Sequence, residues 1–184
     1  MGVPQRRRRL FIVGRRGHWA TPFCFPTARP RVSLVLALDP LEVGDSPYRL
    51  PATRLARVNA TAALVRCKAD GVDVELDGAD LVVDTEHSRG RRRIARPFSP
   101  CLFASRKKGF WILTRGRWMR PHEALRCQGV DVGAYQWPSS NAECHRLAGN
   151  GICVNVLVEL FQELLGDLGL GSHTSATQRR LRLK

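Results

Sequence analysis

The sequence has few acidic residues, no paired cysteines and no long apolar run, and each shortage excludes a class of protein. None of the six cysteines stands in a Cys-x-x-Cys pair, so a zinc ribbon or a thioredoxin-like site has no support. The five histidines are scattered without metal-ligand spacing, and we expect no metal site. No apolar stretch approaches the length that spans a bilayer, which predicts no membrane partner. Without a recognisable signal peptide, we expect an intracellular protein with reduced thiols.

Positive charge dominates the composition. The 184 residues include 30 lysines and arginines against 16 aspartates and glutamates, which gives a formal net charge of +14. This excess predicts a polyanionic partner, and nucleic acid is the first candidate because neutralised phosphates release their counterions. We therefore expect the nucleus or the nucleoid as the location. An organelle is the alternative, because arginine richness is also typical of transit peptides.

An arginine run joins an apolar segment near the start of the sequence. The arginines at positions 6–9 are followed directly by four apolar residues at positions 10–13. Taken alone, such an arginine run is typical of a solvated basic tail or a nucleic-acid contact. The continuous apolar run after it predicts a short buried strand.

The middle of the sequence contains repeated prolines and short apolar runs. Prolines recur as far as Pro51, which predicts loops and short strands rather than long helices. Apolar patterns predict strands at residues 72–76, 81–83 and 109–113. We interpret this part of the chain as irregular, β-rich and basic.

Helix signals become clear after residue 117. A proline-first, glycine-last pattern predicts a short helix between Pro121 and Gly129. Ser140 and Glu143 form a capping-box pattern, which predicts a second helix that runs to about residue 148. Apolar residues at helical spacing over 152–165 predict a third, amphipathic helix.

Three segments with chemistry-bearing residues follow one another in order. The first is a Gln-x-Arg-x-Arg pattern at residues 5–9, the second covers residues 117–129, and the third is a Gly-Asn turn with its apolar helix at 147–157. Together they resemble the eighth, ninth and tenth motifs of DNA (cytosine-5) methyltransferases, with a variable insert between the first and the second. The sequence departs from the family pattern at Met119, where a leucine is usual, and at Val130, where a phenylalanine is usual.

The resemblance implies an α/β fold, namely the C-terminal fragment of a Rossmann-like, S-adenosyl-L-methionine-dependent methyltransferase with an inserted small β-rich target-recognition domain. Residues 1–17 would supply a strand of the large catalytic domain, 18–116 the target-recognition region, 117–170 the closing helices of the large domain, and 171–184 a basic tail. The family's Phe-x-Gly-x-Gly, Pro-Cys-Gln and Glu-Asn-Val segments do not occur in this sequence. Cys101 follows a proline but falls in the recognition region, so we interpret it as structural or incidental.

The missing segments imply a chain that is incomplete and inactive alone. It would be either a truncated product or one part of a split enzyme, whose second chain carries the missing motifs. The intact enzyme would transfer a methyl group from S-adenosyl-L-methionine to C5 of cytosine in double-stranded DNA. An RNA-directed enzyme on the same scaffold stays open, because the catalytic loop that would distinguish the two substrates is missing.

The resemblance also implies catalytic roles in the arginine run. Arg9 would contact the flipped cytosine and stabilise the charge that develops during attack, while Arg7 would organise its neighbours. Arg6 and Arg8 would point to the opposite side, because alternate residues of a strand share one face.

Three residues of the Gly-Asn segment would bind the cofactor. Asn150, Gly151 and Ile152 match positions that border the methionine end of S-adenosyl-L-methionine in the family. A Gly-Asn turn at a helix start exposes backbone N–H groups and a side-chain amide to a ligand. The alternative is that Asn150 simply caps the following helix.

Contacts with DNA phosphates are expected inside the recognition region. The residues are Arg91, Arg92, Arg93, Arg106, Lys107 and Lys108. The alternative function is a non-enzymatic basic nucleic-acid-binding protein. In that case no ordered motifs are required, and Gln5, Glu123 and Asn150 would be ordinary surface or capping residues.

Overall fold

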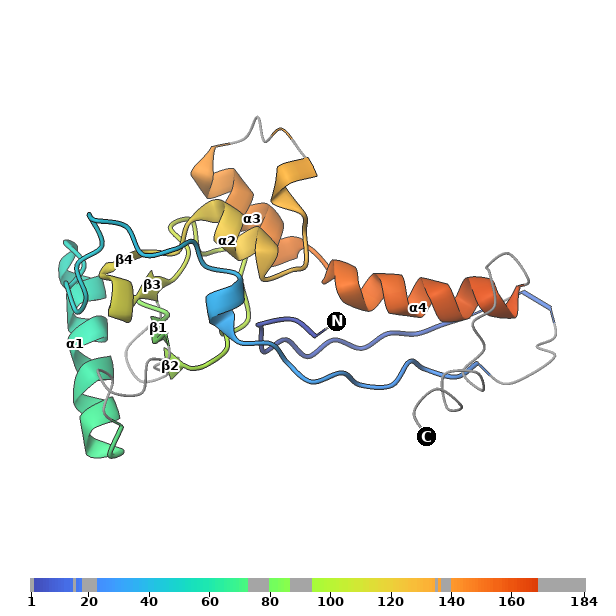
Figure 1. The fold of residues 1–184 in the computed structure, drawn as a ribbon, viewed down its shortest axis with the longest axis horizontal. Coiled ribbons are helices and arrows are strands. Elements are labelled where there is room, and N and C mark those ends of the chain that lie inside the picture. The colour runs from blue at the N-terminus through green and yellow to red at the C-terminus, as the bar shows by residue number, and fades with distance from the viewer. Residues whose placement is uncertain are drawn as a thin grey trace.

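The computed structural model describes residues 2–14, 16–17, 23–72, 80–86, 94–134, 136 and 140–168, and these form a mixed α/β structure (Figure 1). The described strands form one antiparallel sheet in the order β2-β1-β3-β4. Its strands are β1 (Val82–Val83), β2 (Ile94–Ala95), β3 (Trp111–Ile112) and β4 (Arg117–Trp118). The helices are α1 (Arg54–Ala69), α2 (Pro121–Arg126), α3 (Asn141–Asn150) and α4 (Val154–Asp167), with 3₁₀ turns η1 (Leu34–Leu36), η2 (Leu113–Arg115) and η3 (Val132–Ala134).

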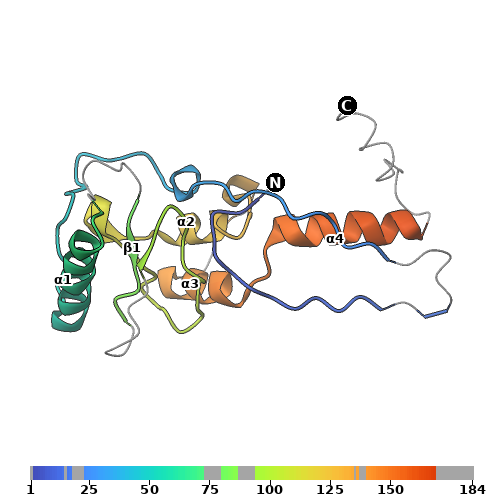
Figure 2. The same ribbon diagram turned by 90° about the horizontal axis from the view of Figure 1, so that it is seen from below.

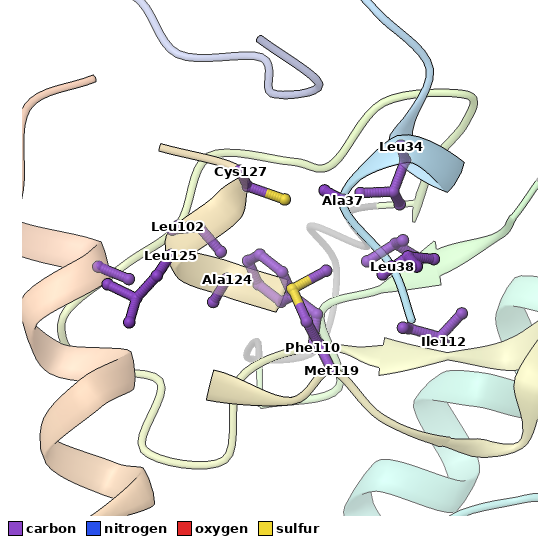
Figure 3. Close-up of a cluster of buried hydrophobic side chains, with 12 residues drawn as sticks. Leu34, Ala37, Leu38, Leu102, Phe110, Ile112, Met119, Ala124, Leu125 and Cys127 are labelled. Carbon is purple, nitrogen blue, oxygen red and sulfur yellow. The ribbon is translucent and has the colours of Figure 1, made fainter. Parts of the chain in front are cut away.

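The sheet is buried on both faces. Val82 pairs with Ile112 and belongs with it to one apolar cluster, whereas Val83 pairs with Trp111 and belongs to another. The first cluster contains Phe110 and residues of η1 and α2 (Figure 3). The second contains Ala60, Ala63 and Cys67 of α1 together with Leu81, Val83, Trp111 and Leu113. Burial on both faces explains why these strands are continuous apolar runs in the sequence.

The long helix α1 contradicts the prediction of loops and short strands for this part of the chain. Its sixteen residues include neither proline nor glycine, and Ala56, Ala60, Ala63 and Cys67 recur at helical spacing and are buried. The proline run ends at Pro51, just before the helix begins. The prolines therefore delimit this helix and do not prevent it.

Most of the other predicted elements are confirmed. The predicted strand at 81–83 contains β1, and the one at 109–113 contains β3. The strand predicted at 72–76 falls almost wholly on residues 73–79, which lie outside the described part. All three predicted helices are present as α2, α3 and α4, although α3 continues to Asn150, beyond its predicted end at about residue 148.

The buried strand predicted for residues 10–13 is wrong. These residues form no strand, and the side chains of Leu10 and Ile12 are 85% and 87% exposed. Among the described residues 2–14, β-type pairing is limited to an isolated bridge between Gln5 and Ser99, which lies before the apolar run. A strand is buried only where neighbouring strands bond its backbone and cover its side chains, and the described residues provide no such sheet here.

Three segments extend together from the body of the molecule. Helix α4 projects outward, and residues 2–14 and 23–33 run in the same direction (Figures 1 and 2). An ion pair of 2.7 Å between Arg29 and Glu159 joins the second segment to α4. The described strands are all antiparallel, so the Rossmann-like fold stays a prediction.

The predicted border between residues 116 and 117 falls inside the sheet. Strand β4 begins at Arg117 and pairs with β3, which belongs to the predicted recognition region. Phe110 and Met119, on either side of this border, lie together in the first cluster, next to Ala124 of α2 (Figure 3). The recognition region and the closing helices therefore share one apolar core.

Candidate functional site

Four segments that are distant in sequence meet at one place, which we call the motif junction: residues 4–7, 99–104, 128–129 and 148–155. The first two are joined by backbone bonds. The N–H of Ser99 donates to the carbonyl of Pro4 at 2.8 Å, and the N–H of Arg6 donates to the carbonyl of Ser99 at 2.9 Å. This pairing attaches the arginine run to the end of the predicted recognition region.

Arg7 connects three of these segments through its guanidinium group. Nη2 donates to the carbonyl oxygens of Gly149 at 3.0 Å and Gly151 at 2.8 Å, and Nη1 donates to that of Leu102 at 3.4 Å. The side chain is half-buried, and burial is the main reason that its pKa is lowered. The last carbonyls of a helix have no intrahelical donor, so Arg7 serves as a cationic cap for the C-terminal end of α3.

Two glycines allow the junction to close. Gly129 has a φ of +74°, and a Cβ built there would lie 2.3 Å from Oδ1 of Asn155. A Cβ at Gly149 would lie 2.1 Å from the backbone nitrogen of Ala104. Both distances are far below van der Waals contact, so the backbones can approach only where the side chain is absent.

Gln128 joins the ninth-motif segment to the tenth. Its side-chain Nε2 donates to the carbonyl of Ala148 at 2.7 Å, and its backbone carbonyl accepts from the N–H of Val154 at 2.8 Å. Gln5 lies on the other side of the junction and is 3% exposed. Neither polar atom of its side-chain amide has a hydrogen-bond partner within the described residues. Such a buried, unpaired amide is rare in native proteins and requires an explanation.

The predicted catalytic arginines occupy two environments. Arg7 turns inward to the junction, whereas Arg6, Arg8 and Arg9 are exposed. The alternation predicted for these arginines, with Arg7 and Arg9 on one strand face opposite Arg6 and Arg8, does not appear, because residues 6–9 form no strand and Arg9 is exposed like Arg6 and Arg8. The contact of Arg9 with a flipped base stays a prediction.

The predicted cofactor residues belong to the motif junction and lie at its surface. Asn150 is exposed and is the last residue of α3, Gly151 follows it as the C-cap, and Ile152 is exposed. The N-cap of α4 is Cys153, so the alternative in which Asn150 caps the following helix is wrong. The reason is that α3 continues through residue 150. A role at the cofactor stays a prediction for all three residues.

A second network holds the ninth-motif segment, and its centre is Glu123. This carboxylate is fully buried and accepts hydrogen bonds from Arg117 at 2.8 and 2.9 Å. It also accepts from the backbone N–H groups of Arg120 at 2.7 Å and Asp39 at 2.9 Å. Four charge-assisted bonds compensate for the burial of the carboxylate.

Asp39 completes this network, although no motif or spacing in the sequence pointed to it. Its carboxylate accepts hydrogen bonds from Arg120 at 2.8 Å and Arg126 at 2.6 Å, and it contacts His122. Burial raises the pKa of Asp39, but hydrogen bonds from Arg126, His122 and Arg120 outweigh it and hold that pKa well below its usual value. The basic residues of the ninth-motif segment are thus used to anchor residue 39.

The predicted DNA contacts are placed only in part. Arg91, Arg92 and Arg93 lie outside the described residues. Lys107 and Lys108 are exposed. Arg106 pairs with the buried carboxylate of Asp84 at 2.8 and 3.1 Å, so its guanidinium has an internal partner. Contact of any of these residues with DNA stays a prediction.

The thiols are consistent with structural roles. Burial raises the pKa of Cys127 to about 12, which makes it unreactive at neutral pH. Cys101 is half-buried and points its Sγ toward the carbonyl of Leu102 at 3.6 Å. In the described part of the chain, no group of three or more histidines, cysteines and carboxylates is placed to hold a metal ion.

Neither a membrane-spanning helix among the described residues nor a relative among curated proteins was found. Among the described helices, none combines the length and the apolar character needed to cross a membrane. No protein-family model matches the chain, and no curated protein matches its sequence.

Proposed function

We propose that this chain is the C-terminal portion of a DNA (cytosine-5) methyltransferase and that it is inactive alone. The observation that carries the proposal is the guanidinium of Arg7, which bonds to the carbonyls of Gly149 and Gly151. The segments that resemble the eighth and the tenth motif of the family are thereby in direct contact. A chance resemblance of short fragments would not require them to meet.

The burial of two motif residues also supports this proposal over the alternative. A basic nucleic-acid-binding protein would make Gln5 and Glu123 ordinary surface or capping residues. Glu123 does cap α2, but it is also fully buried and bonds Arg117 and Asp39. Gln5 is buried with an unpaired amide, which fits a site whose remaining groups come from another segment.

Helix α4 has an apolar face that nothing in the described structure covers. Five apolar residues recur at intervals of four and three, and each is at least 38% exposed: Val154, Val158, Phe161, Leu165 and Leu168. Leu10 and Ile12 are exposed as well. Uncovered stripes of this kind mark interaction surfaces. In our proposal they are covered by the rest of the large catalytic domain.

The residues beside the junction fit one end of the cofactor. Asn150 presents an exposed amide and Ile152 an exposed apolar side chain, on either side of the glycine whose carbonyl Arg7 holds. Such an edge suits the polar and aliphatic parts of an amino-acid group. S-adenosyl-L-methionine, when bound, supplies the methyl group, and Asn150, Gly151 and Ile152 would border its methionine end.

The chain's own contribution to the chemistry is electrostatic. Arg9 donates to O2 of the flipped cytosine and stabilises the negative charge that develops on the ring during attack. Arg7 fixes the end of α3 and so keeps Arg9 and Asn150 in a constant relative position. The thiolate nucleophile and the glutamate that contacts N3 come from segments that this sequence does not contain.

A complementation assay tests the proposal. Transfer of labelled methyl from S-adenosyl-L-methionine to duplex DNA is measured for this chain, for a separately expressed large-domain segment that carries the nucleophile and cofactor loops, and for their mixture. We expect transfer only in the mixture. Arg9→Ala should abolish it, while the matched change Arg8→Ala should leave it within about twofold, because the proposal gives the neighbouring Arg8 no contact with the base.

Two further arms separate the remaining alternatives. Duplex RNA in place of DNA should receive no methyl group, and transfer to RNA alone would assign the chain to an RNA-directed enzyme. Tight DNA binding without transfer in any mixture would favour the non-enzymatic binding protein.

A further inference from the structure

A cavity of about 490 Å³ lies on the side of the sheet where α1 ends. It is formed by the C-terminal end of α1, strand β2 with the residues that follow it, and two residues of the extended segments, Arg6 and Arg31. We call it the arginine pocket. The residues that line it include Arg6, Arg31, Arg66, Asp70, Arg96 and Phe98.

The charge of this pocket is strongly positive. Four arginines line it against a single carboxylate, Asp70. Arg66 and Asp70 form an ion pair with a separation of 3.8 Å, and both side chains are more than 60% exposed. Such an exposed pair contributes little, so it does not neutralise the guanidinium. Arginine forks match phosphate oxygens in a bidentate geometry, which makes an organophosphate the fitting anion.

The arginines come from separate elements that the backbone holds in place. The bridge between Gln5 and Ser99 fixes the backbone of Arg6. Arg31 stacks over the ring of Phe98, with its guanidinium carbon 5.4 Å from the ring centre. Arg96 follows strand β2 in the chain and lines the pocket together with Cys67 of α1.

The rest of the wall is apolar. Cys67, Val72, Ile94 and Phe98 form a surface on which a flat ring can lie. A volume of about 490 Å³ is in the range of small-molecule sites, and it is larger than an inorganic phosphate needs. Asp70 can accept a hydrogen bond from a sugar hydroxyl, which a bare phosphate does not offer.

We propose that the arginine pocket binds a nucleotide, with the phosphate on the arginines and the base against the apolar wall. The nucleotide is either free or one unit of a nucleic-acid strand. The pocket borders the motif junction at Arg6 but uses different side chains, because Arg7 turns inward to the carbonyls of Gly149 and Gly151 and does not line the pocket. The inference therefore does not depend on methyl transfer.

Calorimetric titration of the whole chain with AMP tests the proposal. We expect one saturable site, a loss of affinity of about tenfold in Arg66→Gln and in Arg31→Gln, and no more than about twofold loss in Arg54→Gln. Arg54 is the matched control, since it is an exposed arginine of the same helix and lies outside the pocket. Equal losses in Arg54→Gln and Arg66→Gln would overturn the proposal, because they would show attraction by net charge alone.

Two more measurements keep the result interpretable. Circular dichroism melting should give the same midpoint for all three variants, because the substituted side chains are exposed. Inorganic phosphate should compete with AMP only at much higher concentration, and equal competition would refute the role of the apolar wall.

A final comparison identifies the source of the nucleotide. AMP is displaced with a short single-stranded oligonucleotide and, separately, with the matching duplex. Displacement by the single strand at a lower concentration than AMP itself assigns the pocket to a nucleic-acid strand. Displacement by neither assigns it to a free nucleotide.

Discussion

The guanidinium of Arg7 donates a 2.8 Å hydrogen bond to the carbonyl oxygen of Gly151, a residue 144 positions later in the sequence. A second bond from the same nitrogen reaches Gly149. Together they satisfy carbonyls at the end of α3 that no backbone donor within the helix reaches. The arginine run is thereby attached to the C-terminal helices, in addition to its backbone bonds with Ser99.

Removal of this side chain should destabilise the chain. We expect Arg7→Ala to lower the free energy of unfolding by about 1–3 kcal/mol, since two or three carbonyls lose a charged donor in a half-buried site. Urea denaturation followed by circular dichroism measures this change. The control is Arg8→Ala, which removes an exposed neighbour and should change stability by less than about 0.5 kcal/mol. Equal effects would show that the bonds of Arg7 contribute nothing.

A methyl group at Gly149 should also disrupt the junction. Its Cβ would lie 2.1 Å from the backbone nitrogen of Ala104. Gly149 belongs to helix α3, and Ala104 lies in a turn closed by the hydrogen bond from the N–H of Arg106 to the carbonyl of Phe103, so a shift of either backbone would disturb hydrogen bonds. We expect Gly149→Ala to cost about 1–3 kcal/mol, the range for overpacking, despite the better helix propensity of alanine. Gly166→Ala in α4 is the matched control, because a Cβ there meets nothing within 4 Å. It should stabilise by about 0.5–1 kcal/mol. Thermal melting of both variants tests the pair, and a stabilised Gly149→Ala would contradict the contact.

The features that the sequence predicted correctly depend on short-range signals. Ser140 accepts a hydrogen bond from the N–H of Glu143, three residues later, so its pattern is visible in any short window. The proline at the start of α2 acts in the same local way. The strands around Val82 and Trp111 were visible because both faces of the sheet are buried and the runs are apolar throughout.

The features that the sequence missed depend on distant partners or on competing signals. Asp39 and Glu123 are 84 positions apart, and no local pattern indicates that one backbone N–H bonds the other carboxylate. Helix α1 was missed because the prolines before it outweighed the buried alanine stripe within it. Residues 10–13 have the composition of a buried strand, yet they pair with no sheet in the described structure. The prediction of a buried strand failed because composition does not show whether a neighbouring strand is present.

Asp39 should make stability depend on acidic pH. Its folded-state pKa is lowered below the unfolded value of about 4, so the folded state binds its proton less readily than the unfolded state does. The carboxylate therefore stabilises the fold above pH 4, and this contribution is lost as the pH falls below that value. We expect Asp39→Asn to unfold more easily at pH 6 and to show a flatter loss of stability between pH 4 and pH 2.5. Urea midpoints across this range measure it, and parallel curves would contradict the assignment.

His145 should make the stability of the fold depend on pH in a second range, which lies above that of Asp39. Burial lowers the pKa of its imidazole, which lies against Gly109, where an added Cβ would come within 2.5 Å of the ring. The unfolded chain takes up this proton near pH 6.5, whereas the folded chain resists it, so the fold loses stability as the pH falls from 7 toward 5. His145→Gln should flatten the pH dependence in this window and leave the acidic window of Asp39 in place. Unfolding midpoints at half-unit intervals between pH 7.5 and pH 5 test this. If the midpoint depends on pH as steeply in the variant as in the unchanged chain, His145 does not cause the dependence.

The exposed apolar face of α4 allows a direct test of the proposal that a large-domain segment covers it. Phe161 is 53% exposed at the middle of the apolar stripe, so Phe161→Glu should leave the melting midpoint of the isolated chain within about 2 °C. The same change should reduce binding to the large-domain segment at least tenfold, because a charge buried in an apolar interface without a partner costs several kcal/mol. Gln162→Glu adds the same charge next to it, at an exposed polar position, and should reduce binding by less than about twofold. Biolayer interferometry with the immobilised chain measures both affinities. If the two variants bind equally well, the stripe is not the interface, and the proposed docking of a large-domain segment on it is wrong.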